Sequence, residues 1–226
     1  MKRKERIVCV MLFVTLVTVF LYCKVLRFDF SWKDEIRFAC EKYGVEQKYI
    51  YAIIKAESDF RTDAVSSKGA IGLMQVLPHT AAEVGAKLNL PAFDLFCAKD
   101  NIEIGTYYFK YLLEKFSNVQ HAVLAYNAGE GNVSAWLKDQ AYSDDGVTLK
   151  HDPFGESADY LQRVMFYARV ARLYRLDSPS VKQGFRRSKQ QKEAFYGRRM
   201  TVFCFSEGRV FKSERTHVTR KGKLYE

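Results

Sequence analysis

The sequence lacks the cysteine and histidine patterns that would indicate a metal centre or a disulfide-stabilised fold. Its 226 residues include five cysteines, which are scattered and never form a C-x-x-C pair. The four histidines likewise show no spacing typical of metal ligands. We therefore expect no zinc site, no disulfide framework and no cofactor.

A cleavage signature is also missing from the N-terminus. Four basic residues among the first six precede an almost unbroken apolar run over residues 7–22, which extends to residue 26 if Lys24 reaches the membrane interface. Small residues in an A-x-A arrangement, as a signal peptidase requires, do not follow the run. The bulky Tyr22 also argues against lipid attachment at Cys23. The pattern predicts an uncleaved, single-pass transmembrane signal anchor within residues 1–27, with the rest of the chain outside the cytoplasm; a buried core helix is the alternative.

Acidic residues are scarce only at the two ends of the chain. The net charge is +10, yet residues 28–177 hold seventeen basic and twenty-one acidic residues. The basic excess thus belongs to residues 1–27 and to residues 178–226, where the helical pattern dissolves. Because the central segment carries no excess of basic residues, nucleic-acid binding is not indicated. We interpret residues 178–226 as a basic tail of uncertain order, either a solvated linker or a segment that rests on an anionic surface. Apolar and polar residues alternate weakly around residues 206–208, and this pattern does not decide whether a hairpin forms there.

The central segment is typical of one mainly α domain over residues 28–177. Apolar residues recur at helical spacing, and capping signals at Ser31, Gly44, Pro78 and Asp100 mark helix ends. Residues 59–77 are rich in Ser, Gly and Asp, which predicts a loop with a small β-hairpin. The expected helices cover residues 32–43, 47–58, a short stretch after 78, 101–116, 119–127 and 157–176.

One carboxylate interrupts an apolar stripe. Ile50, Ile53 and Ile54 define a helical face whose next position is Glu57. A glutamate at the edge of such a stripe usually turns toward water. A glutamate that instead stays on the apolar face is desolvated, which raises its pKa and keeps it protonated near neutral pH. That is the state required of a general acid.

Three clusters decide between these two interpretations. "ESDFRTDAVSSKGAIGLMQVLP" begins at Glu57, "AYNAGEGNV" spans residues 125–133, and "DPFGESADYLQRV" spans residues 152–164. In this order and spacing they resemble the soluble lytic transglycosylase catalytic domain of the goose-type lysozyme superfamily, over roughly residues 36–175. The resemblance implies a lysozyme-like α+β domain that acts on peptidoglycan glycan strands. It thereby favours the catalytic interpretation of Glu57.

The resemblance also implies a mechanism with a single carboxyl group. Glu57 would protonate the glycosidic oxygen between MurNAc and GlcNAc, the substrate's N-acetyl group would stabilise the cation, and Glu57 would then remove the C6 hydroxyl proton to close a 1,6-anhydro ring. Asp59 lies about 200° around the helix from Glu57 and is not expected to take part, whereas spacing leaves Asp63 open.

Substrate-binding roles follow residue by residue from the same resemblance. Ser66 matches the serine near the N-acetyl group, with Ser67 as the alternative register, and Met74 and Gln75 match residues that line the cleft. Tyr126 is expected to direct its hydroxyl at Glu57. Asn127 matches a substrate-contacting asparagine and Glu156 a second cleft acid. Three of these residues also have a plain structural alternative: turn residue for Ser66, core aromatic for Tyr126, helix N-terminal acid for Glu156. The sequence departs from the family pattern at Thr62, Asp152 and Ser157.

Two other functions remain open at this point. The same site could hydrolyse the bond, with water in place of the C6 hydroxyl, or the chain could be a membrane-anchored wall-binding protein without activity. Protein partners and the choice between endo and exo cutting are not indicated by the sequence.

Overall fold

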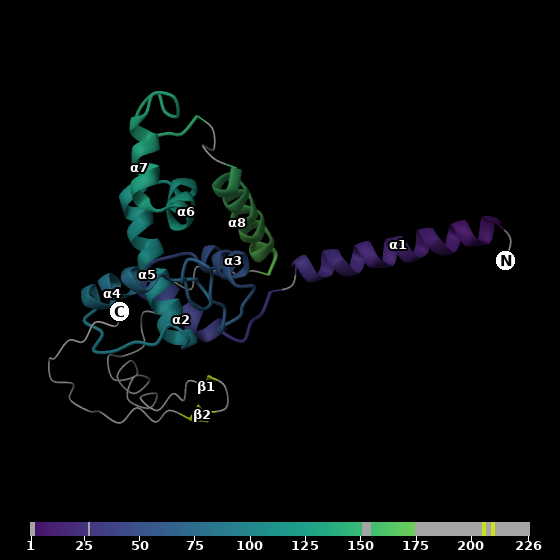
Figure 1. Cartoon of the computed structure of the whole chain (residues 1–226), viewed down its shortest axis with the longest axis horizontal. Helices are drawn as coiled ribbons and strands as arrows, with labels where there is room; N and C mark the ends of the chain where they lie inside the picture. The colour runs from purple at the N-terminus through teal and green to yellow at the C-terminus, as the bar shows by residue number, and fades with distance from the viewer. Residues whose placement is uncertain (1–2, 27, 151–154, 175–204, 207–208, 211–226) are drawn as a thin grey trace. The chain divides into compact units, whose positions relative to one another are not determined.

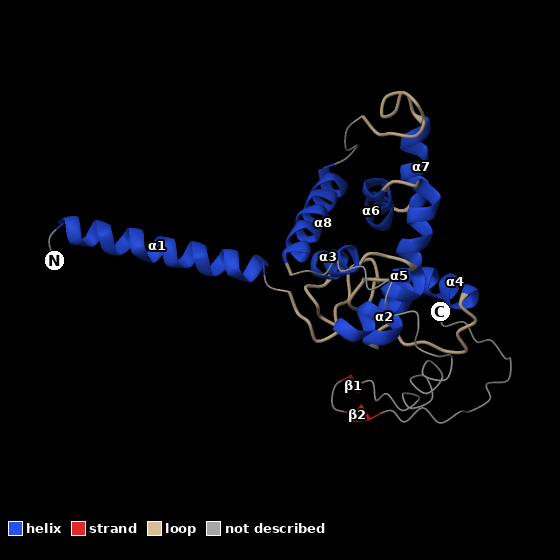
Figure 2. Cartoon of the chain, turned by 180° about the vertical axis from the view of Figure 1, so that it is seen from behind, coloured by secondary structure: helices blue, strands red, loops and turns tan. Residues whose placement is uncertain are grey.

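The computed structural model describes residues 3–26, 28–150, 155–174, 205–206 and 209–210. Most of these residues are helical (Figures 1 and 2). The contacts divide the chain into two units, residues 1–184 and residues 185–226. The elements are α1 (Arg3–Leu26), α2 (Lys33–Tyr43), α3 (Gln47–Glu57), α4 (Pro78–Lys87), α5 (Ala98–Phe116), α6 (Val119–Ala128), α7 (Glu130–Lys138), α8 (Gly155–Leu173), β1 (Phe205–Ser206) and β2 (Arg209–Val210).

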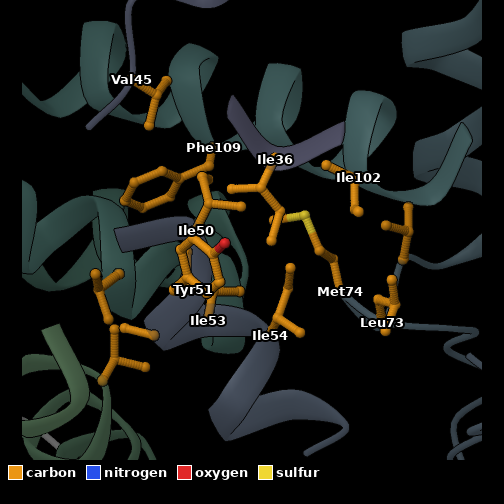
Figure 3. Packing of buried hydrophobic residues seen from close by; sticks show 14 of the residues in the cluster. Ile36, Val45, Ile50, Tyr51, Ile53, Ile54, Leu73, Met74, Ile102 and Phe109 are labelled. Atoms are coloured by element: carbon orange, nitrogen blue, oxygen red, sulfur yellow. The ribbon is translucent and has the colours of Figure 1, made fainter. Parts of the chain in front are cut away.

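Helix α3 lies at the centre of the folded domain. Five consecutive residues, 50–54, are buried, so this part of the helix is covered on all sides and not along one stripe only. Its main packing partner is α8, while α5 packs on α2 and α6. The close view in Figure 3 shows Met74 among Ile36, Ile54 and Ile102, so that the segment after residue 71 belongs to the same core. The position of Glu57 at the end of α3 is therefore fixed by a helix that is buried in the core.

The loop between α3 and α4 is organised by one buried side chain. Asn101 of α5 accepts a hydrogen bond from the Met74 amide and donates to the carbonyls of Ile71 and Leu95, each at 2.8 Å. Gly72 lies against this amide with φ +78°, and a Cβ there would come within 2.3 Å of Asn101 Nδ2. Only glycine fits this close approach.

The predicted β-hairpin in this loop is not confirmed. Residues 65, 71 and 76 form two isolated antiparallel bridges instead of paired strands. Ile71 and Val76 exchange two backbone hydrogen bonds of 3.0 Å, but this bridge does not extend into a ladder. The Asn101 side chain satisfies the Met74 amide in the turn between them and donates a further bond to the Ile71 carbonyl. Among the described residues, the strands that do pair are β1 and β2, in antiparallel register with Phe205 opposite Val210.

Most expected helices are present, but three details of the prediction are wrong. Residue 32 and not Ser31 occupies the N-cap of α2, and its side chain makes no capping bond. Helix α5 begins at Ala98, so Asp100 lies inside the first turn, where its Oδ2 accepts from the Asp94 amide at 3.0 Å. Helix α7 was not expected at all.

Two further expectations concern the N-terminus and the cysteines. The predicted transmembrane anchor is not confirmed, because no helix within the described residues has the length and apolar character needed to cross a membrane. Helix α1 nevertheless exposes apolar side chains along residues 7–22. Cys40 is a buried free thiol, whereas Cys97 is disulfide-bonded, a pairing that the scattered cysteines did not reveal.

Candidate active site

Glu57 is the last residue of α3 and lies where the buried helix meets the loop that follows it. Its side chain is partly buried, while the next residue, Ser58, is fully covered. The Ser58 hydroxyl donates to the Leu73 carbonyl at 2.8 Å, which ties the end of the helix to the segment before α4. The carboxyl group of Glu57 is thus held on a rigid support.

Burial gives this carboxyl group an unusual acidity. Desolvation raises the pKa of Glu57 from 4.5 to about 7, against the lowering effects of a hydrogen bond from Tyr160 and of the nearby Arg163 charge. The predicted desolvation is therefore confirmed. At neutral pH both the protonated and the ionised form are populated, so the group can donate a proton and take one back.

Tyr160 is the direct partner of this carboxyl group. Its hydroxyl donates to Glu57 Oε1 at 2.7 Å, and its ring is only 2% exposed. Burial raises the pKa of Tyr160 well above its ordinary value, so the hydroxyl keeps its proton and remains a donor. The guanidinium of Arg163 lies 6.0 Å from the centre of the same ring. Helix α8 therefore sets the orientation of Glu57.

Tyr126 lies near Glu57 but differs from expectation in its hydrogen bond. Its hydroxyl donates to the Met74 carbonyl at 2.9 Å. Burial first, and then the nearby charge of Glu57, raise the pKa of Tyr126 well above its usual range. Tyr126 therefore forms part of the wall beside the carboxyl group and braces the Met74 backbone.

The remaining residues of the first cluster shape the loop. Gln75, at φ 47°, donates from Nε2 to the carbonyls of Ala64 (3.0 Å) and Gly72 (2.9 Å). The Ser66 hydroxyl accepts from the Ala70 amide at 3.0 Å and can still donate. Met74 is completely buried. The structure thus shows turn-forming contacts for Ser66 and Gln75, and their contact with substrate stays a prediction.

The second and third clusters meet through one hydrogen bond. The Ser157 hydroxyl donates to Asn127 Oδ1 at 3.3 Å, although the two residues are thirty positions apart. Asn127 itself is exposed, as is Glu156 in the first turn of α8. Both can reach a solvent-borne ligand, and their substrate contacts also stay predictions.

Asp59 is turned to solvent, although not for the predicted reason: α3 ends at Glu57, and Asp59, at φ 52°, does not lie on the helix. Its side chain is 71% exposed and pairs with Lys55 Nζ at 2.5 Å. In the described part of the chain, no three His, Cys, Asp or Glu side chains gather closely enough to hold a metal ion. The burial of Glu57 and its hydrogen bond from Tyr160 therefore suit this carboxyl group to acid–base chemistry.

Two residues that matter here were not identified from the sequence. Tyr160 and Asn101 were only included in the expected helices over residues 157–176 and 101–116, and neither was given a role. Tyr160 lies within the quoted third cluster, four residues after Glu156, which is one helical turn and therefore the same face. That spacing was the available signal. For Asn101, the only sequence feature that could have indicated a structural role was a polar side chain among apolar helix positions.

Comparison with known proteins agrees with this geometry. The family described as Transglycosylase SLT domain matches residues 34–147. The soluble lytic murein transglycosylase of Escherichia coli K12 is 32% identical over 161 residues, which cover 69% of this chain and 25% of that protein. Membrane-bound lytic murein transglycosylase C of Yersinia enterocolitica is 36% identical over 155 residues, covering 57% of this chain and 43% of that protein.

Solved structures give the same result. An inactive mutant of the lytic transglycosylase Slt from Pseudomonas aeruginosa, in which glutamine replaces a glutamate, superposes with a TM-score of 0.58 and 31% identity. The match covers 68% of this chain and 26% of that one. The 70 kDa soluble lytic transglycosylase in complex with bulgecin A gives a TM-score of 0.59 at 30% identity, over 69% of this chain and 26% of that one.

This chain spans about a quarter of the length of the soluble relatives it matches. The matched part contains α3 with Glu57, the loop braced by Asn101, and α6 with Tyr126. On these grounds, the chain belongs to the Transglycosylase SLT domain family.

Proposed function

We propose that this protein is a peptidoglycan lytic transglycosylase that cleaves the MurNAc–GlcNAc β-1,4 bond without water. The observation that carries the proposal is the lone, partly buried Glu57 carboxyl with a pKa of about 7. Such a group is protonated often enough to act as an acid, and its conjugate base is strong enough to act as a base. One residue can then serve both steps.

The proposed steps balance in atoms and charge. Protonated Glu57 gives its proton to the glycosidic oxygen, the bond to MurNAc C1 breaks, and the GlcNAc side leaves with a free hydroxyl. The substrate's own N-acetyl oxygen stabilises the resulting cation. Ionised Glu57 then takes the proton of the MurNAc C6 hydroxyl, whose oxygen bonds to C1 and closes the 1,6-anhydro ring. Glu57 is protonated again at the end.

The surroundings of Glu57 support this assignment of roles. Tyr160 holds the carboxyl in one orientation, and Asp59 is exposed and engaged with Lys55. A scheme with two carboxylates would need a partner on the opposite side of the sugar, about 5–9.5 Å away, and Asp59 does not offer one. We assign substrate contact to Ser66, Gln75, Asn127 and Glu156 as part of the same proposal, with Tyr126 forming the wall. Met74 does not line the cleft as predicted, because its side chain is 0% exposed; its backbone carbonyl accepts the hydrogen bond that holds Tyr126.

The mass of the product tests the proposal. The full chain is incubated with purified peptidoglycan, and the released muropeptides are analysed by mass spectrometry. Anhydro ends are expected, and each is lighter by one water than the corresponding hydrolysis product. If only products with reducing ends are found, the same site acts as a lysozyme-type hydrolase. If the protein binds peptidoglycan but releases no muropeptides, its role is wall binding.

We further propose that the protein is attached to a membrane through residues 7–26, with its catalytic domain on the extracytoplasmic side. The exposed apolar side chains of α1 support attachment, the four basic residues before them favour a cytoplasmic start, and peptidoglycan lies outside the cytoplasm. Retention in the membrane fraction after washing with high salt and alkaline carbonate is expected. Release by salt alone would contradict it.

The activity is proposed to reside in residues 28–177. Every site residue assigned above lies between residues 57 and 160. A protein consisting of residues 28–177 is expected to fold, as circular dichroism would show, and to release the same products as the full chain. If this fragment is folded but inactive while a protein of residues 28–226 is active, residues 178–226 are part of the site. The fragment lacks the disulfide of Cys97, because Cys40, its other cysteine, is a free thiol.

A further inference from the structure

The first residues after α1 are fixed to the folded domain. Phe28 is only 5% exposed, and its ring packs edge-on against Tyr51 and Tyr167, with centroids 6.2 and 6.5 Å apart. Phe28 follows Leu26, the last residue of α1, by two positions. Because two residues span at most about 7 Å, Phe28 lies within that distance of the end of α1, whatever the direction of the helix.

Exposed apolar side chains gather on the surface beside Phe28. Outside α1, seven large hydrophobic side chains are exposed among the described residues, and four of them form what we call the apolar patch: Phe30, Phe166, Leu173 and Tyr174. Tyr174 packs against both Phe28 and Phe30, with ring centroids 5.7 and 5.6 Å apart. Leu173 is 81% exposed, and Phe166, seven positions before it, lies on the same face of α8.

The charges around the apolar patch are mainly positive. Arg169 and Arg172 are exposed in the last two turns of α8, whereas the acidic residues of this helix lie in its first two turns. Beyond α8 the sequence continues to residues 178–226, which hold thirteen basic and four acidic residues. The opposing carboxylate of Asp29 is engaged, because its Oδ1 accepts from the Ser31 amide at 2.8 Å. Arginines at a helix C-terminus also complement the helix dipole, but beside exposed aromatic and aliphatic side chains they are typical of a surface that binds anionic lipid.

From this arrangement we infer that the apolar patch, with Arg169 and Arg172 beside it, docks on the surface of an anionic lipid bilayer. The inference rests on the membrane attachment proposed above, which brings the end of α1, and therefore Phe28, to the bilayer. The interfacial layer on each side of a bilayer is about 5–7 Å thick, and aromatic side chains are enriched in it. A protein partner for the apolar patch would have to share this narrow space with the lipid headgroups.

Docking would also set the distance between the bilayer and the catalytic carboxyl group. Tyr160, which donates to Glu57, precedes Tyr174 by fourteen residues along α8. A helix rises by 1.5 Å per residue, so the apolar patch and the partner of Glu57 are about 21 Å apart along this helix. The docked domain would therefore act close to the membrane.

A tryptophan reporter tests this inference with the full chain in lipid vesicles. Leu173→Trp places an indole in the apolar patch, and Val147→Trp is the matched control, because Val147 is 65% exposed in the loop after α7. The vesicles contain phosphatidylglycerol and phosphatidylethanolamine, either with or without bromine on the acyl chains close to the headgroups. Bromine quenches indole fluorescence only at short range, and the parent chain gives the contribution of Trp32 and Trp136.

The fluorescence added by Leu173→Trp is expected to shift to shorter wavelength and to be quenched by brominated lipid, whereas that added by Val147→Trp should not be. Arg169→Gln combined with Arg172→Gln should weaken the quenching, and so should replacement of phosphatidylglycerol by phosphatidylcholine. Either change removes the attraction between the arginines and the anionic headgroups. Circular dichroism checks that each variant is folded.

Flotation of the vesicles in a density gradient separates this inference from the proposed attachment. If the chain floats but Leu173→Trp is quenched no more than Val147→Trp, the docked face is overturned and the attachment stands. A short-wavelength emission without bromine quenching would assign the apolar patch to a protein surface, such as a second copy of the chain, and quenching that is independent of lipid charge would overturn the choice of an anionic surface. A chain that does not float contradicts the attachment itself, and the inference with it.

Discussion

The hydroxyl of Tyr160 donates a hydrogen bond of 2.7 Å to Oε1 of Glu57, across 103 positions of sequence. A bond to the ionised form of a carboxyl group lowers its pKa, so Tyr160 opposes the rise that burial causes. The acidity of Glu57 is therefore a balance between desolvation, which raises its pKa, and the Tyr160 hydrogen bond and the Arg163 charge, which lower it.

Tyr160→Phe should shift this balance upward. Loss of the bond raises the pKa of Glu57 above about 7, so the fall of kcat/KM on the alkaline side should move to higher pH. The pH profile of peptidoglycan cleavage measures the shift. Tyr167→Phe is the control, because Tyr167 lies on the same helix and its ring packs on Phe28. An unchanged alkaline midpoint in Tyr160→Phe would show that the bond does not tune the acid.

Glu57→Gln should abolish most of the activity. The amide keeps the shape of the side chain but cannot donate a proton to the leaving oxygen, and general acid–base catalysis contributes about 10²–10⁴-fold. Asp59→Asn should be nearly silent, because Asp59 is exposed and paired with Lys55. Release of anhydro-muropeptides at matched concentrations of folded protein provides the comparison. Equal losses in the two variants would contradict a single-acid mechanism.

Glu57→Gln should also change the dependence of stability on pH. An unfolded glutamate titrates near 4.5 and the folded Glu57 at about 7, so between these values the folded state holds more protons and stability falls as pH rises. Above pH 7 the wild type keeps an ionised, partly buried carboxylate at a cost of about 3 kcal/mol, which the variant does not have.

Urea denaturation at pH 4 and pH 8 checks this sign. The two proteins should have similar midpoints at pH 4, and Glu57→Gln should be the more stable at pH 8. Glu114→Gln serves as a control, since Glu114 is an exposed partner of Lys110 whose pair contributes little. A variant that is less stable than the wild type at pH 8 would mean that Glu57 is not destabilising when ionised.

Gly72→Ala and Gly69→Ala should separate steric conflict from backbone strain. Both glycines have φ near +78°, so each alanine costs about 1–2 kcal/mol in the left-handed region. Only at Gly72 would the added Cβ also strike Asn101 Nδ2 and the Leu95 carbonyl, whereas Gly69 has open space. Thermal unfolding should show a clearly larger loss for Gly72→Ala. Equal losses would mean that the loop can move away from Asn101.

Local sequence patterns predicted most helices because each carries its own signals. Apolar spacing located α3, α5, α6 and α8, and Gly44 and Pro78 marked helix boundaries correctly. Helix α7 was missed because its start lies among glycines, although Val133, Trp136 and Leu137 recur at helical spacing.

Contacts between distant segments could not be predicted in the same way. The chemistry of Glu57 followed from an apolar stripe and a resemblance, but its partner Tyr160 lies on another helix. The predicted hairpin is reduced to isolated bridges, and the turn between residues 71 and 76 is held by the Asn101 side chain, which comes from another helix. The expected bond from Tyr126 to Glu57 runs instead to the Met74 carbonyl, because the backbone fold sets which acceptor is nearer.

The near-neutral pKa of Glu57 has a consequence for inhibitor design. A cationic sugar analogue favours the ionised carboxylate, so below pH 7 its binding must expel a proton. By linkage, its affinity should rise with pH up to about 7 and then level off, while a neutral analogue should show no such trend. An iminosugar for this site should therefore be ranked at the pH of the compartment in which the protein works, because a ranking made in acidic buffer would undervalue every charged compound.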